Sequence, residues 1–125
     1  NIKNISLLFQ KVNFYSCDFS KAFEKIKGKN NFLYLDPPYA PENNTSFVKY
    51  NKEGFDKEQH LKLFKLINKF SNNNKIMLSN SNVNLVIENF DKEIYNYKIL
   101  SCKRSINSKN PGSKTEEVII TNYLK

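Results

Sequence analysis

The chain has 125 residues, 39% of them hydrophobic, which allows one packed domain with a real core. Twenty lysines and arginines against twelve acidic residues give a net charge of +8, which favours a polyanionic partner such as nucleic acid, although lysine-rich surfaces also arise without one. No apolar run approaches the roughly 18 residues of a membrane span, and no signal peptide is visible, so we expect an intracellular protein that is not secreted and has no membrane contact. Cys17 and Cys102 have no metal-like spacing, so we expect reduced thiols and no metal.

The first third of the chain predicts a strand, a helix and a second strand. Residues 1–13 have little pattern, and residues 14–17 predict a short strand. Ser20 can cap the helix, and Gly28 suits its end. The apolar residues at helical spacing are Phe19, Ala22, Phe23 and Ile26. Residues 32–35 form a continuous apolar run, which is typical of a strand buried on both faces.

The middle of the chain predicts an exposed loop at residues 40–54, then a helix and a strand. Asp56 and Gln59 resemble a capping box at the start of the helix. The apolar stripe behind them consists of Leu63, Leu66, Ile67 and Phe70, and three asparagines at 72–74 end the helix. Residues 75–79 predict the strand.

The end of the chain predicts one more helix and an antiparallel hairpin. Ser81 can cap the helix, whose inward residues are Val83, Val86, Ile87 and Phe90. Strands near residues 94–100 and 117–123 follow, joined by a basic loop at 103–114 without a helix. Because strands alternate with helices before this hairpin, we expect an α/β fold with right-handed crossovers and a mostly parallel sheet covered on both faces. No internal repeat or linker marks a second domain.

The string Asp-Pro-Pro-Tyr at residues 36–39 follows the apolar strand at 32–35. In open α/β sheets, ligands bind outside the carboxyl ends of the strands. Pro37 and Pro38 have fixed φ angles and no N–H, so their carbonyls are free acceptors held in one direction. Asp36 and a proline carbonyl could accept the two N–H bonds of an exocyclic amine on a planar ligand and aim the nitrogen lone pair at an electrophile, with the ring of Tyr39 as a stacking face. The alternative is a simple Pro-Pro turn with a capping Asp.

Residues 14–123 resemble the carboxyl-terminal half of the Dam-type (D12 class) adenine-N6 DNA methyltransferases. The resemblance is carried by "CDF" at 17–19, "YLDPPYAP" at 34–41 with the following Phe47, Tyr50, Phe55 and "EQHLKL", "LSNS" at 78–81, and "RSINS…EEVIITNY" at 104–123. It implies part of a Rossmann-like S-adenosylmethionine-dependent methyltransferase fold. It also implies methyl transfer from S-adenosylmethionine to N6 of an adenine flipped out of duplex DNA.

The resemblance further implies roles for single residues. Asp36 and the Pro37 carbonyl would hold the target amine, and Tyr39 would stack on the flipped base. Asp18 and Phe19 would contact the adenosine end of the cofactor, and Asp36 would lie close to its methionine part. The alternative for Asp18 is an acid that stabilises the start of a helix. The expected DNA contacts are Pro38, Asn44, Thr45, Phe47, Tyr50, Arg104, Ser105, Lys109 and Lys114, although the charged loop could equally be only solvated.

The family also builds its cofactor pocket from a Gly-rich turn in an earlier segment. Gly28, Gly54 and Gly112 are isolated and cannot form such a turn. We therefore expect residues 1–13 to be the tail of a missing target-recognition region and residues 14–125 to be the carboxyl-terminal part of the catalytic domain. The missing amino-terminal half would belong to the same chain or to a partner chain, and this chain alone would be inactive. A remnant that no longer catalyses is the third possibility.

Two other functions stay open at this point. The same chemistry could act on adenine in RNA or on a protein amide, since related motifs serve those acceptors. In a different class, the chain could be a non-catalytic nucleic-acid-binding subunit that docks onto a partner and binds weakly through its basic loop.

Overall fold

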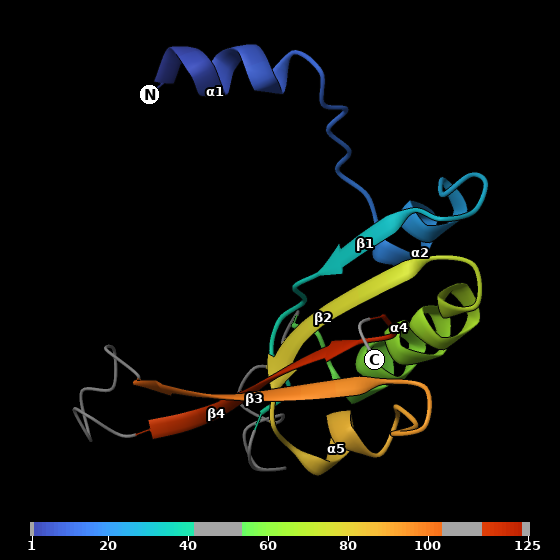
Figure 1. Ribbon diagram of the computed structural model, residues 1–125, viewed down its shortest axis with the longest axis vertical. Helices are drawn as coiled ribbons and strands as arrows, with labels where there is room; N and C mark the ends of the chain where they lie inside the picture. Colours follow the sequence, from blue (N-terminus) through green and yellow to red (C-terminus); the bar gives the residue numbers. More distant parts are fainter. Residues whose placement is uncertain (1, 42–53, 104–113, 124–125) are drawn as a thin grey trace.

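The computed structural model describes residues 2–41, 54–103 and 114–123. Its centre is a four-stranded sheet in the order β1-β2-β4-β3 (Figure 1). The strands are β1 (Phe32–Leu35), β2 (Lys75–Ser81), β3 (Asn96–Lys103) and β4 (Lys114–Thr121).

The described sheet is mixed. β1 and β2 are parallel, with Leu35 opposite Leu78, whereas β4 is antiparallel to both β2 and β3. The predicted strand at 32–35 and the predicted antiparallel hairpin are therefore confirmed, but a mostly parallel sheet is not. The hairpin explains the difference, because β4 inserts between β2 and β3 and makes two of the three pairings antiparallel.

The predicted strand at 14–17 is wrong. The backbone there lies outside the sheet, and Phe14 and Tyr15 are 70% and 66% exposed. No described strand lies beside this segment to bond with it, and an isolated short strand has no stability of its own. Among the described residues 2–13, the only regular element is a helix, α1 (Ile2–Phe9), which has no buried residue and stands away from the sheet (Figure 1).

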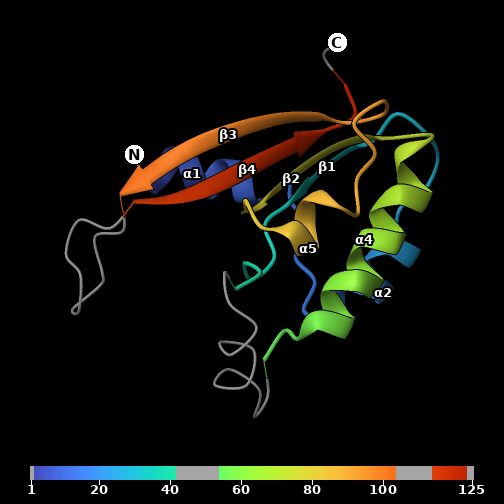
Figure 2. The same ribbon diagram turned by 90° about the horizontal axis from the view of Figure 1, so that it is seen from below.

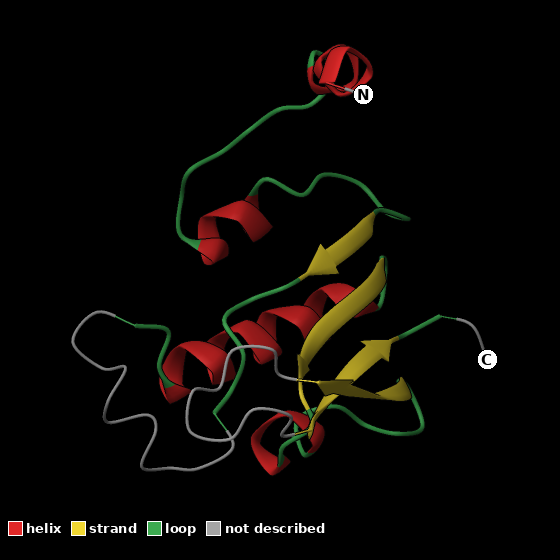
Figure 3. Ribbon diagram, turned by 90° about the vertical axis from the view of Figure 1, so that its left-hand side faces the viewer, coloured by secondary structure: helices red, strands yellow, loops and turns green. Residues whose placement is uncertain are grey.

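Three helices cover one face of the sheet. Figure 2 shows α2 (Phe19–Glu24), α4 (Lys57–Ser71) and α5 (Asn84–Ile87) together on that side, and Figure 3 shows the helices in red beside the yellow strands. The core between them and the sheet includes Phe64, Ile67, Ile76, Leu78 and Ile120, all fully buried. In the described part of the chain the other face is bare, so coverage of both faces is not observed.

The uncovered face changes the expectation for β1. Leu33 and Leu35 pack against the core, but Phe32 and Tyr34 are 56% and 58% exposed. The strand is thus buried on one face only, and its continuous apolar sequence leaves Phe32 and Tyr34 more than half exposed.

Of the three capping residues predicted for the helix starts, one is confirmed. Asp56 caps α4, as predicted, by accepting a hydrogen bond of 2.8 Å from the Gln59 N–H. α2 is capped by Asp18 and not by Ser20. Ser81 belongs to β2, so α5 begins after Val83 without a side-chain cap and is only four residues long.

Candidate active site

Asp36 lies directly past the carboxyl end of β1, and its side chain is exposed. Within residues 2–41, 54–103 and 114–123, its carboxylate has no hydrogen bond or ion pair. Pro37 is half-buried, and Pro38 is exposed beside it. A carboxylate without a partner at a strand end is free to meet a ligand, whereas the capping Asp of a simple turn would be bonded to its own backbone.

The next residues of the motif are fixed to neighbouring elements. The Pro38 carbonyl lies 3.0 Å from Nε2 of His60 on α4. The Tyr39 hydroxyl hydrogen-bonds the Ser79 hydroxyl, and the Ala40 N–H donates to Oδ1 of Asn80 at 2.8 Å. Because β2 runs parallel to β1, the carboxyl ends of the two strands lie at the same end of the sheet, where β2 supplies Ser79 and Asn80. Three consecutive residues, Pro38, Tyr39 and Ala40, are therefore bonded to α4 or β2.

Neither His60 nor Asn80 is identified as a functional residue by the sequence pattern. Both are fully buried, and both lie inside strings that carry the family resemblance, "EQHLKL" and "LSNS". The signal that points to Asn80 is a polar residue in an apolar strand. Its Oδ1 accepts from two backbone N–H groups, while its Nδ2 is buried without a hydrogen-bond partner among the described residues.

The environment of Tyr39 raises the pKa of its phenol. Partial burial is the main cause, the Ser79 hydrogen bond lowers the pKa in part, and the nearby Glu117 and Asp36 carboxylates add smaller increases. The residue as a whole remains 38% exposed, and stacking of its ring on a base stays a prediction.

A cavity of about 230 Å³ opens beside Asp36 and the two prolines. Its other walls are Phe19, Tyr34, Leu35, Phe55 and Leu63. The structure thus places Phe19 and Asp36 on the walls of one cavity, and contact of either residue with a cofactor stays a prediction. Sites for whole drug-sized ligands usually measure about 300–1,000 Å³, so this cavity can hold only part of a larger molecule.

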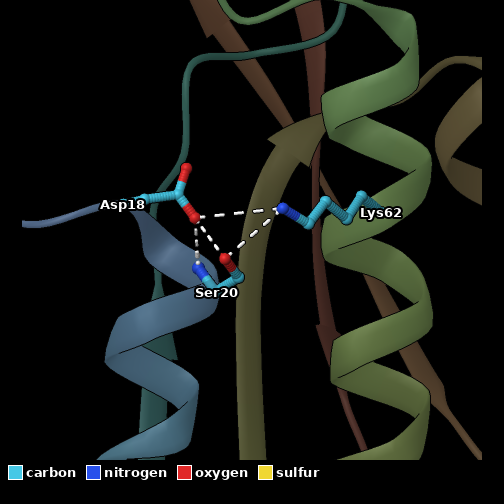
Figure 4. Close-up of polar contacts among 3 residues, drawn as sticks. All are labelled: Asp18, Ser20 and Lys62. Carbon is cyan, nitrogen blue, oxygen red and sulfur yellow. Dashed lines mark hydrogen bonds and ion pairs between the residues drawn. The ribbon is translucent and has the colours of Figure 1, made fainter.

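Asp18 is not among the residues that line this cavity. Figure 4 shows its Oδ1 accepting hydrogen bonds from the N–H and the hydroxyl of Ser20, with Lys62 Nζ 4.0 Å away. These Ser20 hydrogen bonds, and to a lesser degree the Lys62 charge, hold the pKa of Asp18 below its usual value. Asp18 is thus the cap of α2, and a contact with a cofactor stays a prediction.

Most of the expected DNA contacts fall outside the described residues, namely Asn44, Thr45, Phe47, Tyr50, Arg104, Ser105 and Lys109. Pro38 is exposed next to Asp36, and Lys114 begins β4 opposite Lys103. Contact of any of these residues with DNA stays a prediction. In the described part of the chain, no helix is long and apolar enough to cross a membrane, and no three His, Cys, Asp or Glu side chains gather as they would around a metal ion.

Comparison with known proteins gives consistent matches. The model of the D12 class N6 adenine-specific DNA methyltransferase family matches residues 1–106. The Type II methyltransferase M.MjaIII of Methanocaldococcus jannaschii is 37% identical over 98% of this chain and 43% of its own length. The Type II methyltransferase M1.LlaDCHI of Lactococcus lactis subsp. cremoris is 34% identical over 90% and 39%, and the DNA adenine methylase of Haemophilus influenzae is 34% identical over 86% and 37%.

The chain spans about two fifths of the length of these curated relatives. Among solved structures, the methyltransferase EhMeth of Entamoeba histolytica matches 85% of this chain and 41% of that one, with 16% identity and a TM-score of 0.43.

Proposed function

The chain belongs to the D12 class N6 adenine-specific DNA methyltransferase family, and we propose that it is the carboxyl-terminal catalytic part of an enzyme that methylates N6 of adenine in duplex DNA. The observation that carries this proposal is the exposed, unpartnered Asp36 beside a diproline corner at the end of β1. The family supports the reaction class, and the exposed corner supports the residues proposed to perform it.

We propose the following role for the corner. The Asp36 carboxylate and the Pro37 carbonyl accept the two N–H bonds of the adenine amine and turn the nitrogen lone pair towards the methyl donor. When the nitrogen has bonded the methyl carbon, it carries one proton too many. Asp36, which holds the amine in this arrangement, can accept that proton, and its exposure lets it pass the proton to water. Tyr39 offers its ring to the flipped base, tethered at its hydroxyl by Ser79.

The methyl donor of the family is S-adenosylmethionine, which supplies an electrophilic methyl group. The cavity suits part of such a molecule, because Phe19, Tyr34 and Phe55 provide aromatic walls for a purine ring and Asp36 provides a negative charge for a cationic centre. Its volume of about 230 Å³ leaves the rest of the cofactor to be held by other residues. A Gly-rich turn outside this chain would supply them.

The unpaired side of the edge strand β1 is evidence for a missing half of the catalytic domain. β1 is the first strand in the order, and in the described part of the chain only β2 pairs with it. An apolar groove of about 270 Å³ runs along β1 beside α2, with Phe23, Ile26 and Leu33 among its walls. We propose that the amino-terminal half, in the same chain or a partner chain, packs here, with residues 1–13 at the end of a target-recognition region.

A methylation assay tests the proposed acceptor. The complete enzyme is incubated with labelled S-adenosylmethionine and either duplex DNA or RNA of the same sequence, and the modified nucleosides are identified by mass spectrometry. We expect N6-methyladenine in DNA only. Methylation of RNA alone would move the acceptor to RNA, and an enzyme that binds DNA but methylates neither would favour a non-catalytic binding subunit.

A further inference from the structure

The single histidine of the chain, His60, contacts the diproline corner from behind. It lies in the first turn of α4 and is fully buried. Its Nε2 is 3.0 Å from the Pro38 carbonyl oxygen, and its Nδ1 is 2.7 Å from the Asp56 carbonyl oxygen. A carbonyl oxygen can only accept, so each of these contacts is a hydrogen bond when the ring nitrogen carries the hydrogen.

The ring has little freedom to move away from these carbonyls. Its centroid lies 4.7 Å from the Phe55 ring and 5.9 Å from the Phe64 ring, both in edge-to-face contact. Phe55 also lines the cavity beside Asp36. The Asp56 carbonyl that faces Nδ1 already accepts the helical hydrogen bond of the His60 N–H at 3.0 Å. The imidazole is thus fixed to the start of α4, and α4 is fixed to the core.

The contact at Pro38 controls the backbone next to the reacting groups. The two proline rings fix φ at residues 37 and 38, so the corner can move only by rotation about ψ. When Nε2 of His60 carries the hydrogen, its contact of 3.0 Å with the Pro38 carbonyl is a hydrogen bond that would fix this carbonyl and with it ψ of Pro38. Ser79 and Asn80 fix the two residues that follow. Among these three attachments, the one at Pro38 is nearest to the Pro37 carbonyl and Asp36.

We propose that His60 is a positioning residue for methyl transfer, and that its donation from Nε2 to the Pro38 carbonyl fixes the direction of the Pro37 carbonyl and of Asp36. The inference rests on the proposed function of the corner. It differs from a purely structural role of a core histidine because it assigns the effect to one of the two ring nitrogens.

Two substitutions separate the two nitrogens. The amide nitrogen of glutamine reaches about as far as Nε2, and that of asparagine about as far as Nδ1. His60→Gln therefore keeps a donor for Pro38, and His60→Asn keeps one for Asp56 only. Both variants lose the ring contacts with Phe55 and Phe64, so each serves as the stability control of the other. His60→Leu fills the space and donates to neither carbonyl.

The experiment measures kcat, the KM for S-adenosylmethionine and Tm in the complete enzyme, with assays run well below the lowest Tm. We expect His60→Gln to keep most of the kcat. We expect His60→Asn and His60→Leu to lose on the order of 10- to 100-fold in kcat at little-changed KM, which is the cost of a misplacement of about 1 Å at reacting groups.

Equal kcat for the Gln and Asn variants, whether high or low, would overturn the proposal, as would full activity of His60→Leu. Failure of all three variants to fold would show that His60 is only a core residue. If the wild-type enzyme methylates no adenine, the proposed function fails instead, whereas an active wild type with indistinguishable variants counts against His60 alone.

Discussion

Three features of the exposed Asp36 suit it to meet a ligand. It is placed by a strand, it is followed by two residues of fixed φ, and it has no hydrogen-bond or ion-pair partner among the residues that the structure describes. The carboxylate keeps its hydration in the free protein, because the side chain stays in water until a ligand arrives. A preorganised carboxylate of this kind can be used for binding without first breaking another interaction.

Two substitutions of Tyr39 separate the contribution of its ring from that of its hydroxyl. Tyr39→Phe keeps the stacking face and loses only the bond to Ser79, so we expect a small effect on the KM for DNA. Tyr39→Ala loses the face, and base–aromatic stacking is worth about 1–3 kcal/mol. We therefore expect its KM for DNA to rise roughly 5- to 150-fold in steady-state assays. A Phe variant as impaired as the Ala variant would show that the tether, and not the ring, is what matters.

The residues of the site were predictable from the sequence only where they are neighbours in it. Asp36, Pro37 and Tyr39 stand together, so their chemistry can be inferred from the string itself. His60 contacts Pro38 across 22 residues, and Asn80 contacts Ala40 across 40 residues. No local pattern encodes such contacts, since they depend on how α4 and β2 pack against the end of β1.

At the scale of elements, the cap of α2 has a consequence for pH dependence. The pKa of Asp18 is lowered from its ordinary 3.8, chiefly by the Ser20 hydrogen bonds. Its charge therefore contributes stability above about pH 3.8, and this contribution is lost as the pH falls through the lower pKa of the folded state. Asp18→Asn keeps the shape and removes the charge. We expect it to lower Tm at pH 7, and the difference from wild type to disappear in the acid range. A constant difference at all pH values would contradict this assignment.

The asparagine at the end of the hairpin joins three elements. Asn122 accepts from the Ile76 N–H at 2.7 Å and donates to the Ser71 and Asn74 carbonyls, both at 2.8 Å. Asn122→Ala leaves these half-buried backbone groups unpaired, and we expect it to cost roughly 1–3 kcal/mol of unfolding free energy in urea denaturation. Asn84→Ala, at an exposed position, is the matched control. Equal effects of the two variants would mean that water replaces the Asn122 bonds.

The long helix with a capping acid was predictable from the sequence, whereas the strand expected at residues 14–17 was wrong. α4 has its cap, stripe and end at the predicted residues because fifteen residues give four turns of consistent pattern. The segment at 14–17 has the composition of a strand but no neighbour in the sheet. Pairing is a property of two segments, and the sequence of one segment does not determine it.

At the scale of the whole molecule, one face of the sheet and both of its edges, β1 and β3, are bare in the described part of the chain. Phe32, 56% exposed on β1, would be covered by the missing half, whereas Ile99, 57% exposed on β3, lies at the opposite edge. We expect Phe32→Lys to lower the Tm of the complete enzyme more than Ile99→Lys does, because it places a charge in an interface. Equal shifts would indicate that nothing packs on β1.

The most direct measurement compares the methyl transfer rate of the complete wild-type enzyme with those of Asp36→Asn and Glu24→Gln. Asp36→Asn keeps the size of the side chain but removes its charge and one acceptor. Glu24→Gln makes the same chemical change at an exposed position on α2. Loss of one preorganised electrostatic contact typically costs about 10²- to 10³-fold in kcat. We predict a loss of this size for Asp36→Asn, at unchanged Tm, and none for Glu24→Gln. An Asp36→Asn enzyme that still methylates adenine at the wild-type rate would contradict the role assigned to the corner.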